Sequence, residues 1–371
     1  MRKIILIIVI FLLFIGSSSC SVWRELGQTP DEFELKEFES SENFNIDKQI
    51  FENQNPELLS NMSKRMDMSA TIDFFLDETP DRTPSKPIPE ENPILLQSFM
   101  ASTGSIKFVW LGHSSIMINI QNHILLFDPV FSKAASPIKS FVKRFQPPVI
   151  NLEELPEIEW VIISHDHYDH LDMETVEFFK DKRTRFAVPI GVGSHLRYWG
   201  IPEERIVEMD WWQVIEVDGL TIHCTPAQHF SGRTGQDLKT LWASWSVESA
   251  DLQIFFSGDS GYNKHYEQIG KRLGPFKFAF IDSGQYNFKW REVHNTPEEA
   301  VKAAKDLRSE YLIPIHWGMF ELALHPWYEP AVRSYSFSEL QGVNLITPKI
   351  GQLVEMNKIE SSEQWWKNLM P

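Results

Sequence analysis

Cysteine is scarce in this chain of 371 residues, which contains only two. Cys20 directly follows an N-terminal targeting pattern and is therefore a candidate for modification rather than for pairing. Cys224 lies within Leu220–Thr225, an apolar-rich pattern typical of a strand, so we expect it to be a core residue. The sequence consequently predicts no disulfide within the chain, even if the protein is exported to an oxidising compartment.

Positive charge is also in deficit, because 35 Lys and Arg stand against 51 Asp and Glu, a net charge of -16. General nucleic-acid binding needs a basic face, so we expect no nucleic-acid partner. Hydrophobic residues make up 42% of the chain and aromatic residues 13%, enough for a sizeable core. We expect one folded domain over residues 71–371, preceded by an acidic tether and lead-in over residues 20–70.

A long apolar run occurs only near the N-terminus. Ile4–Ile15 follows Arg2 and Lys3 and has twelve residues, too few to span a bilayer comfortably. A short apolar run behind a basic start is typical of a signal peptide, which we place at residues 1–19.

The small residues Gly16–Ser19 before Cys20 resemble the lipobox of bacterial lipoproteins. This resemblance implies a lipidated Cys20 and a protein anchored in the bacterial cell envelope, facing the periplasm or the exterior, with the membrane as partner. Ser17 stands where the lipobox usually has Leu, so ordinary signal cleavage and secretion remain the alternative.

Short strand-like runs alternate with helical patterns from residue 105 onward. Thr296, followed by Pro297 and Glu299, is a strong helix start, and Asp172 is a candidate cap for an earlier helix. Strands are expected over residues 106–111, 116–120, 124–127, 161–164, 185–188, 205–209, 220–225, 242–247, 252–257, 278–282 and 311–315. This alternation predicts an α/β fold.

The stretch Val161–Asp172 concentrates the chemistry of the chain. An apolar run ends at Ser164, and His165, His167, Asp169 and His170 follow within six residues. The spacing of two places His165 and His167 on one side of an extended segment, whereas Asp169 and His170 point elsewhere as the chain bends. Ligands aimed in two directions suit two metal ions better than one. Nitrogen and carboxylate ligands favour zinc, with iron or manganese as weaker candidates.

Three further residues repeat the pattern of a ligand type just past an apolar strand. These are His229, Asp259 and His316. Because ligand sites in open α/β sheets lie beyond the carboxyl ends of the strands, all seven candidates are expected at one edge. His113 and Asp166 are candidates for orienting the ligands, whereas His123, His195, His223 and His265 have no metal-type context.

The order His-x-His-x-Asp-His followed by His, Asp and His resembles the metallo-β-lactamase-fold hydrolases. Other motifs resemble the N-acylphosphatidylethanolamine-hydrolysing phospholipase D branch of that group. These are Gly112-His113-Ser114-Ser115, Phe127-Asp128-Pro129-Val130-Phe131-Ser132, Asp210-Trp211-Trp212, Thr225-Pro226-Ala227-Gln228-His229, Leu241-Trp242-Ala243-Ser244-Trp245-Ser246, Gly258-Asp259-Ser260-Gly261-Tyr262 and Ile315-His316-Trp317-Gly318. The resemblance covers roughly residues 72 to 350. It implies a four-layer αββα sandwich.

The resemblance also implies roles for individual residues. It assigns His165, His167 and His229 to one zinc, Asp169, His170 and His316 to a second, and Asp259 to both. His294, ahead of the expected helix at Thr296, is implied to contact substrate, and Asp169 and His294 are the candidate catalytic residues. A helix N-terminus attracts anions, which makes a phosphate near His294 physically sensible.

We therefore expect a phosphodiesterase of phospholipase D type with two Zn2+ per chain. A hydroxide held between the metals would attack phosphorus and release an N-acylethanolamine from a phospholipid, leaving phosphatidic acid. The run Asp282–Gln285 is more polar than in the animal enzymes that the chain resembles, so the substrate stays open. A lactonase or another small-ester or phosphodiester hydrolase on the same site is the alternative, and a non-catalytic envelope lipoprotein is the alternative of another class. A homodimer is expected from the resemblance alone.

Overall fold

The structure is a computed structural model that describes residues 19–65, 76–92, 96–101, 104–233, 237–359 and 363–371. The expected signal peptide therefore lies outside the described residues, apart from its last residue. Among the helices of the described part, none is long and apolar enough to cross a membrane.

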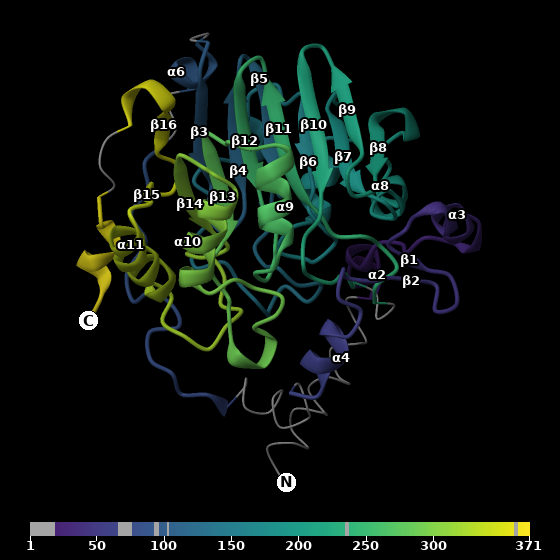
Figure 1. The fold of residues 1–371 in the computed structure, drawn as a ribbon, viewed down its shortest axis with the longest axis horizontal. Coiled ribbons are helices and arrows are strands. Elements are labelled where there is room, and N and C mark those ends of the chain that lie inside the picture. The colour runs from purple at the N-terminus through teal and green to yellow at the C-terminus, as the bar shows by residue number, and fades with distance from the viewer. Residues whose placement is uncertain (1–18, 66–75, 93–95, 102–103, 234–236, 360–362) are drawn as a thin grey trace.

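Two seven-stranded sheets form the centre of the molecule (Figure 1). The first has the order β16-β3-β4-β5-β6-β7-β8 and the second the order β15-β14-β13-β12-β11-β10-β9. The first sheet consists of β3 (Ile106–Trp110), β4 (Ile116–Ile120), β5 (His123–Phe127), β6 (Trp160–Ile162), β7 (Arg185–Pro189), β8 (Ile206–Met209) and β16 (Leu353–Glu355). The second consists of β9 (Val214–Val217), β10 (Leu220–Thr225), β11 (Ser244–Ser249), β12 (Leu252–Phe256), β13 (Phe278–Asp282), β14 (Tyr311–Ile315) and β15 (Asn344–Leu345).

Each sheet has an antiparallel part and a parallel part. In the first sheet, β3, β4 and β5 pair antiparallel, whereas β5 to β8 pair parallel. In the second, β9 to β12 pair antiparallel and β12 to β15 pair parallel. The parallel strands of a sheet end at the same edge, which is where a site can collect residues from several of them.

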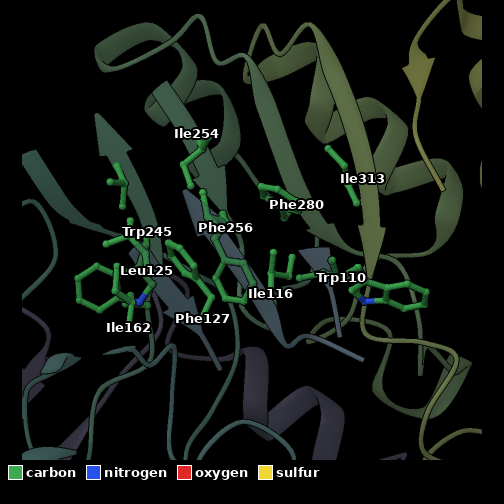
Figure 2. Packing of buried hydrophobic residues seen from close by; sticks show 14 of the residues in the cluster. Trp110, Ile116, Leu125, Phe127, Ile162, Trp245, Ile254, Phe256, Phe280 and Ile313 are labelled. Carbon is green, nitrogen blue, oxygen red and sulfur yellow. The ribbon is translucent and has the colours of Figure 1, made fainter. Parts of the chain in front are cut away.

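The main core lies between the two sheets, which pack face to face (Figure 2). Side chains of the first sheet, such as Trp110 and Phe127, meet side chains of the second, such as Phe256 and Ile313, and all four are at most 1% exposed. Full burial of a large apolar side chain contributes about 1.5–3 kcal/mol each, so this interface is the principal source of stability.

Helices cover the outer faces of both sheets and complete a four-layer αββα sandwich (Figure 1). On the first sheet, α7 (Met173–Phe178) and α8 (Gly193–Tyr198) share an apolar cluster with β5, β6 and β7. On the second, α9 (His265–Arg272) and α10 (Pro297–Asp306) pack on β12 to β14, and α11 (Glu329–Gln341) packs beside α10. The α/β fold expected from the sequence is confirmed.

The remaining elements precede the sandwich in the sequence. They are α2 (Ser19–Leu26), α3 (Glu32–Glu37), the hairpin of β1 (Phe44–Asn45) and β2 (Ile50–Phe51), α4 (Leu58–Ser63) and α6 (Leu96–Met100). The hairpin and α2 lie beneath the lower ends of the strands in Figure 1. This is the edge at which the candidate site is found.

Several of these elements begin where local sequence signals predicted. Helix α10 begins after Thr296, whose side chain accepts from the Glu299 N–H in a full capping box. Asp172 does precede α7, but its carboxylate accepts from the N–H groups of Phe131 and Ser132 instead of capping the helix.

The strand expected at residues 242–247 is shifted, because β11 begins at Ser244. Its partner strand β10 ends opposite Ser244 at Thr225, so residues 242 and 243 have no ladder to join. The Ala243 N–H donates instead to the carbonyl of Ser164, and the carbonyl of Trp242 accepts from Trp211 Nε1. The alternating sequence pattern of residues 242–247 therefore begins two residues before the strand does.

Candidate metal centre

The seven candidate ligands come together at the carboxyl-terminal edge shared by the two sheets. His165, His167, Asp169 and His170 follow β6 of the first sheet. The other three follow strands of the second sheet: His229 after β10, Asp259 after β12 and His316 after β14. The rigid strand ends hold the backbone of each loop, so side chains far apart in the sequence converge.

Three imidazoles form the first group. His167 Nδ1 lies 2.9 Å from His165 Nε2 and 3.2 Å from His229 Nε2. His165 and His229 are 1% exposed. One ligand atom from each of these residues and from Asp259 lies within 4.8 Å of the others, a separation that a single cation can bridge.

The second group consists of His113, Asp169, His170 and His316, whose ligand atoms also lie within 4.8 Å of one another. Asp169 Oδ2 is 3.4 Å from His170 Nε2 and 3.9 Å from His316 Nε2. It is only 2.8 Å from His113 Nε2, which makes His113 a hydrogen-bond partner of the carboxylate. Asp169 and His170 thus lie with His316 in a second group, which directly adjoins the first, since the rings of His165 and His170 have centroids 4.2 Å apart.

Asp259 stands between the two groups, with one carboxylate oxygen toward each. Its Oδ2 is 3.8 Å from His165 Nε2 and 3.6 Å from His229 Nε2. Its Oδ1 is 3.1 Å from both His170 Nε2 and His316 Nδ1. A carboxylate placed in this way can bind two cations at once.

Unpaired polar atoms test whether these residues fit a cation. His170 Nε2 and Asp259 Oδ1 are buried and have no hydrogen-bond partner among the described residues. Such orphaned atoms cost free energy unless something satisfies them, and a cation bound between them would do so. The donor set of imidazole nitrogen and carboxylate oxygen suits a divalent metal of the zinc type.

The pKa values of three imidazoles of the cluster point the same way. Among the protein groups alone, burial raises the pKa of the Asp259 carboxyl to about 7 and lowers the pKa of His165, His229 and His316 well below the usual range. Burial also opposes protonation of His170, but the carboxylates of Asp259 and Asp169 hold its pKa well above the usual range. Neutral imidazoles have the free lone pairs that a metal requires.

A buried carboxylate orients His170 from behind. Asp128 is fully buried, and its Oδ2 lies 2.7 Å from His170 Nδ1, while its Oδ1 accepts the Ser164 N–H at 2.7 Å. A carboxylate on the far nitrogen fixes the ring of a metal-binding histidine and increases its basicity. Sequence reasoning quoted Asp128 within a motif without giving it a role. Its place at the end of an apolar strand, like that of the ligands, was the available signal.

Asp166 faces away from the cluster, as its expected orienting role allows. Its Oδ1 accepts the Gly232 N–H at 2.8 Å and its Oδ2 accepts the Thr240 hydroxyl at 3.0 Å. His195 Nε2 lies 3.4 Å from the same carboxylate. These bonds tie the ligand loop after β6 to the loop after β10, so Asp166 fixes the backbone between His165 and His167.

His294 lies at the rim of the cluster. Its ring is stacked at 13° on the ring of His316, with 5.0 Å between centroids, and 5.1 Å from that of His229. His294 Nδ1 is 2.8 Å from Asp282 Oδ2. The side chain is 11% exposed, so the ring adjoins the ligands and is also partly accessible to solvent.

The N-terminal segment also reaches the centre. The side chain of Asn53, 6% exposed, donates from Nδ2 to the His229 carbonyl at 2.8 Å and accepts the His229 N–H at 3.1 Å. Nearby, the Phe51 N–H donates to the Leu238 carbonyl. The sequence gave no sign of this contact, because Asn53 lies in a polar stretch without periodicity.

The fold and the site define a metal-dependent hydrolase of the metallo-β-lactamase fold. The sequence profile of the beta-lactamase superfamily domain matches residues 123–317, and the chain belongs to this superfamily. A metallo hydrolase from Ignicoccus hospitalis has a similar structure, with a TM-score of 0.52 over 68% of this chain and 98% of that one, at 19% identity.

Two relatives extend the similarity beyond the superfamily domain. An uncharacterized protein of Mycobacterium tuberculosis is 42% identical over 289 residues, 76% of this chain and 77% of its own length. An N-acyl-phosphatidylethanolamine-hydrolyzing phospholipase D of Caenorhabditis elegans is 30% identical over 333 residues, 82% of this chain and 92% of its own. The resemblance found in the motifs is confirmed at the level of the family.

Proposed function

We propose that the protein is a phospholipase D-type phosphodiesterase that binds two zinc ions and hydrolyses N-acylphosphatidylethanolamine-like lipids. The observation that carries the proposal is the placement of Asp259, with one carboxylate oxygen toward each ligand group. Two-metal sites are well suited to displacement at phosphorus. The substrate class comes from the similarity to the Caenorhabditis elegans phospholipase over most of its length.

The residues would divide between the two ions. His165, His167 and His229 would hold one and Asp169, His170 and His316 the other, with Asp259 shared. When bound, the two ions would lower the pKa of a water so that it can act as the nucleophile, and they would neutralise charge that develops on the phosphoryl oxygens. The products expected are an N-acylethanolamine and phosphatidic acid.

The protein groups would position substrate and ligands. Asp128 and His113 hold His170 and Asp169 in place through hydrogen bonds of 2.7 and 2.8 Å. His294 is partly accessible to solvent beside the ligands and would contact the phosphate of the bound lipid. Burial of nearly all these side chains excludes bulk water, which strengthens each electrostatic contact.

We also propose that Cys20 is lipidated and anchors the protein in the bacterial cell envelope. Support comes from the lipobox resemblance at residues 16–20 and from the position of α2, which begins beside Cys20 and lies near the same edge as the site (Figure 1). Trp23 on this helix is 67% exposed. An anchor here would bring the site to a bilayer substrate. Mass spectrometry of the membrane-extracted protein, compared with Cys20→Ser, tests for the acyl modification.

The proposed activity is tested on purified protein lacking residues 1–20. Metal content is measured first, and N-acylethanolamine release from N-acylphosphatidylethanolamine micelles is then followed with phosphatidic acid as co-product. About two zinc ions per chain with turnover of this lipid is the expected result. Two metals without lipid turnover would refute the substrate and direct the search to lactones or small phosphodiesters. No bound metal after zinc is supplied would refute the centre itself.

Asp259→Asn is the matching variant. It replaces one oxygen that faces the ligand groups and removes the negative charge shared between them. We expect loss of metal and of turnover together. Asp251→Asn, an exposed carboxylate in the turn before β12, is the control and should behave as the wild type.

A further inference from the structure

Asp282 is a buried acid beside the candidate site that the expected ligand set does not use. It is the last residue of β13 and is fully buried. β13 lies between β12 and β14, the strands that precede Asp259 and His316. Asp282 therefore ends at the same edge as the ligands but lies one strand away from each.

The hydrogen bonds of Asp282 are concentrated on the segment that carries His294. Oδ2 lies 2.8 Å from His294 Nδ1, and the Asp282 carbonyl accepts from Asn295 Nδ2 at 3.1 Å. Its other carboxylate contacts are the N–H groups of Ser260 and Gly284, both longer at 3.3 Å. Of these three contacts of the carboxyl group, the one with His294 is the shortest.

The pairing decides which nitrogen of His294 is free. Nδ1 is engaged by the carboxyl group whichever partner carries the shared proton, so Nε2 is the nitrogen left for other contacts. Stacking on His316 fixes the plane of the ring, while the bond to Asp282 fixes its rotation within that plane. A ring held in both ways loses little conformational freedom when it binds a ligand.

We propose that Asp282 is a positioning residue that locks His294 with Nε2 toward the phosphate of the substrate. The assignment rests on the proposed contact between His294 and substrate. It adds the residue that makes this contact specific, and it gives a role to a carboxyl group that is fully buried at a strand end and bonded to His294. Asp282 lies within ligand distance of Asp259, His294 and His316, but removing it should free the ring while leaving all seven expected metal ligands in place.

The test uses inorganic phosphate bound to zinc-loaded protein, measured by calorimetry after metal content has been checked. Asp282→Ala should weaken phosphate binding about tenfold, as loss of one oriented hydrogen bond implies, and His294→Ala should do the same. In the double variant the two losses should not add, because Asp282 acts only through His294. Asp282→Asn, which can still bond to Nδ1, should restore most of the affinity.

Tyr266→Phe is the control for disturbance of the surrounding network. Tyr266 accepts from Asn295 Nδ2 behind Asp282 but does not bond to the His294 ring. This variant should bind phosphate as the wild type does. If Asp282→Ala binds phosphate normally while His294→Ala does not, or if the losses of the double variant add, the positioning role is refuted.

Nitrogen-15 spectra of the histidine rings provide a readout that needs neither turnover nor bound metal. The His294 Nδ1 signal, assigned by its loss in His294→Ala, should shift in Asp282→Ala and remain near its wild-type position in Tyr266→Phe. An unchanged signal in Asp282→Ala refutes the pairing. Failure to hydrolyse the lipid, by contrast, would refute the proposed substrate and leave these results standing.

Discussion

Replacing Asn53 by Ala should damage the centre from a segment that precedes the sandwich. The change removes both hydrogen bonds between the Asn53 side chain and the backbone of His229, a residue only 1% exposed. Each backbone group left buried without a partner costs about 1–3 kcal/mol. We expect the free energy of unfolding to fall by about 2–6 kcal/mol, a large share of the roughly 5–15 kcal/mol typical of a folded protein.

The same change should weaken metal binding, because His229 is a candidate ligand whose backbone would no longer be held. Urea denaturation of zinc-loaded protein measures the stability, and competition with a chromophoric chelator measures zinc affinity. Asn55→Ala is the matched control, since Asn55 is exposed and its side chain accepts only a local hydrogen bond, from the Glu57 N–H. Its effect should stay within about 0.5 kcal/mol. The proposed coupling is wrong if Asn53→Ala has the same free energy of unfolding and the same zinc affinity as Asn55→Ala.

Three further perturbations follow from the structure. Removing metal with a chelator should abolish activity and lower the denaturation midpoint, and zinc should restore both. Gly284→Ala should lower activity, because a Cβ there would lie 1.9 Å from the His316 carbonyl oxygen and displace this ligand. Activity and zinc content are measured together, and values equal to those of the wild type would contradict the prediction. Burial lowers the pKa of His265 to about 3, so below pH 6.5 the unfolded chain takes up a proton that the folded chain refuses, and stability falls. Between pH 7 and pH 5 the loss of stability from this one group amounts to about 2 kcal/mol, and His265→Gln should not show it. Equal losses of unfolding free energy in urea titrations of the wild type and the variant would contradict this prediction.

The sequence was most informative where local chemistry and fold agree. Thr296, Pro297 and Glu299 define a helix start within four residues, and α10 begins there. Strands such as β4 and β14 were expected with the bounds that the structure has, because their apolar runs are flanked by clear turn signals or polar residues. Of the edge strands, β9, β15 and β16 were missed; β9 mixes charged and apolar residues and alternates between exposed and half-buried positions.

The candidate ligands were visible because each carries its own context, a histidine or aspartate just past an apolar strand. The residues that hold them either share this context with the ligands or have none. Asp128 has the same local surroundings as a ligand, and only its 2.7 Å contact with His170 shows that it acts from behind. Asn53 and His229 meet across a sequence separation of 176 residues. Contacts of this kind depend on the packed fold and cannot be read from spacing along the chain.

The difference between the ligands and the residues around them bears on how the substrate specificity of the centre could change. The seven candidate ligands are fixed by the requirement to bind cations, whereas the rim is free to vary. Asp282 and His294 form a hydrogen-bonded polar pair beside the ligands. A polar pair at this place favours a charged or hydrogen-bonding group next to the cleaved bond, because a buried polar pair facing an apolar group would lose contacts that it makes with water. The hydrolytic chemistry of the site therefore follows from the ligands, and the choice of substrate follows from the residues between the strand ends.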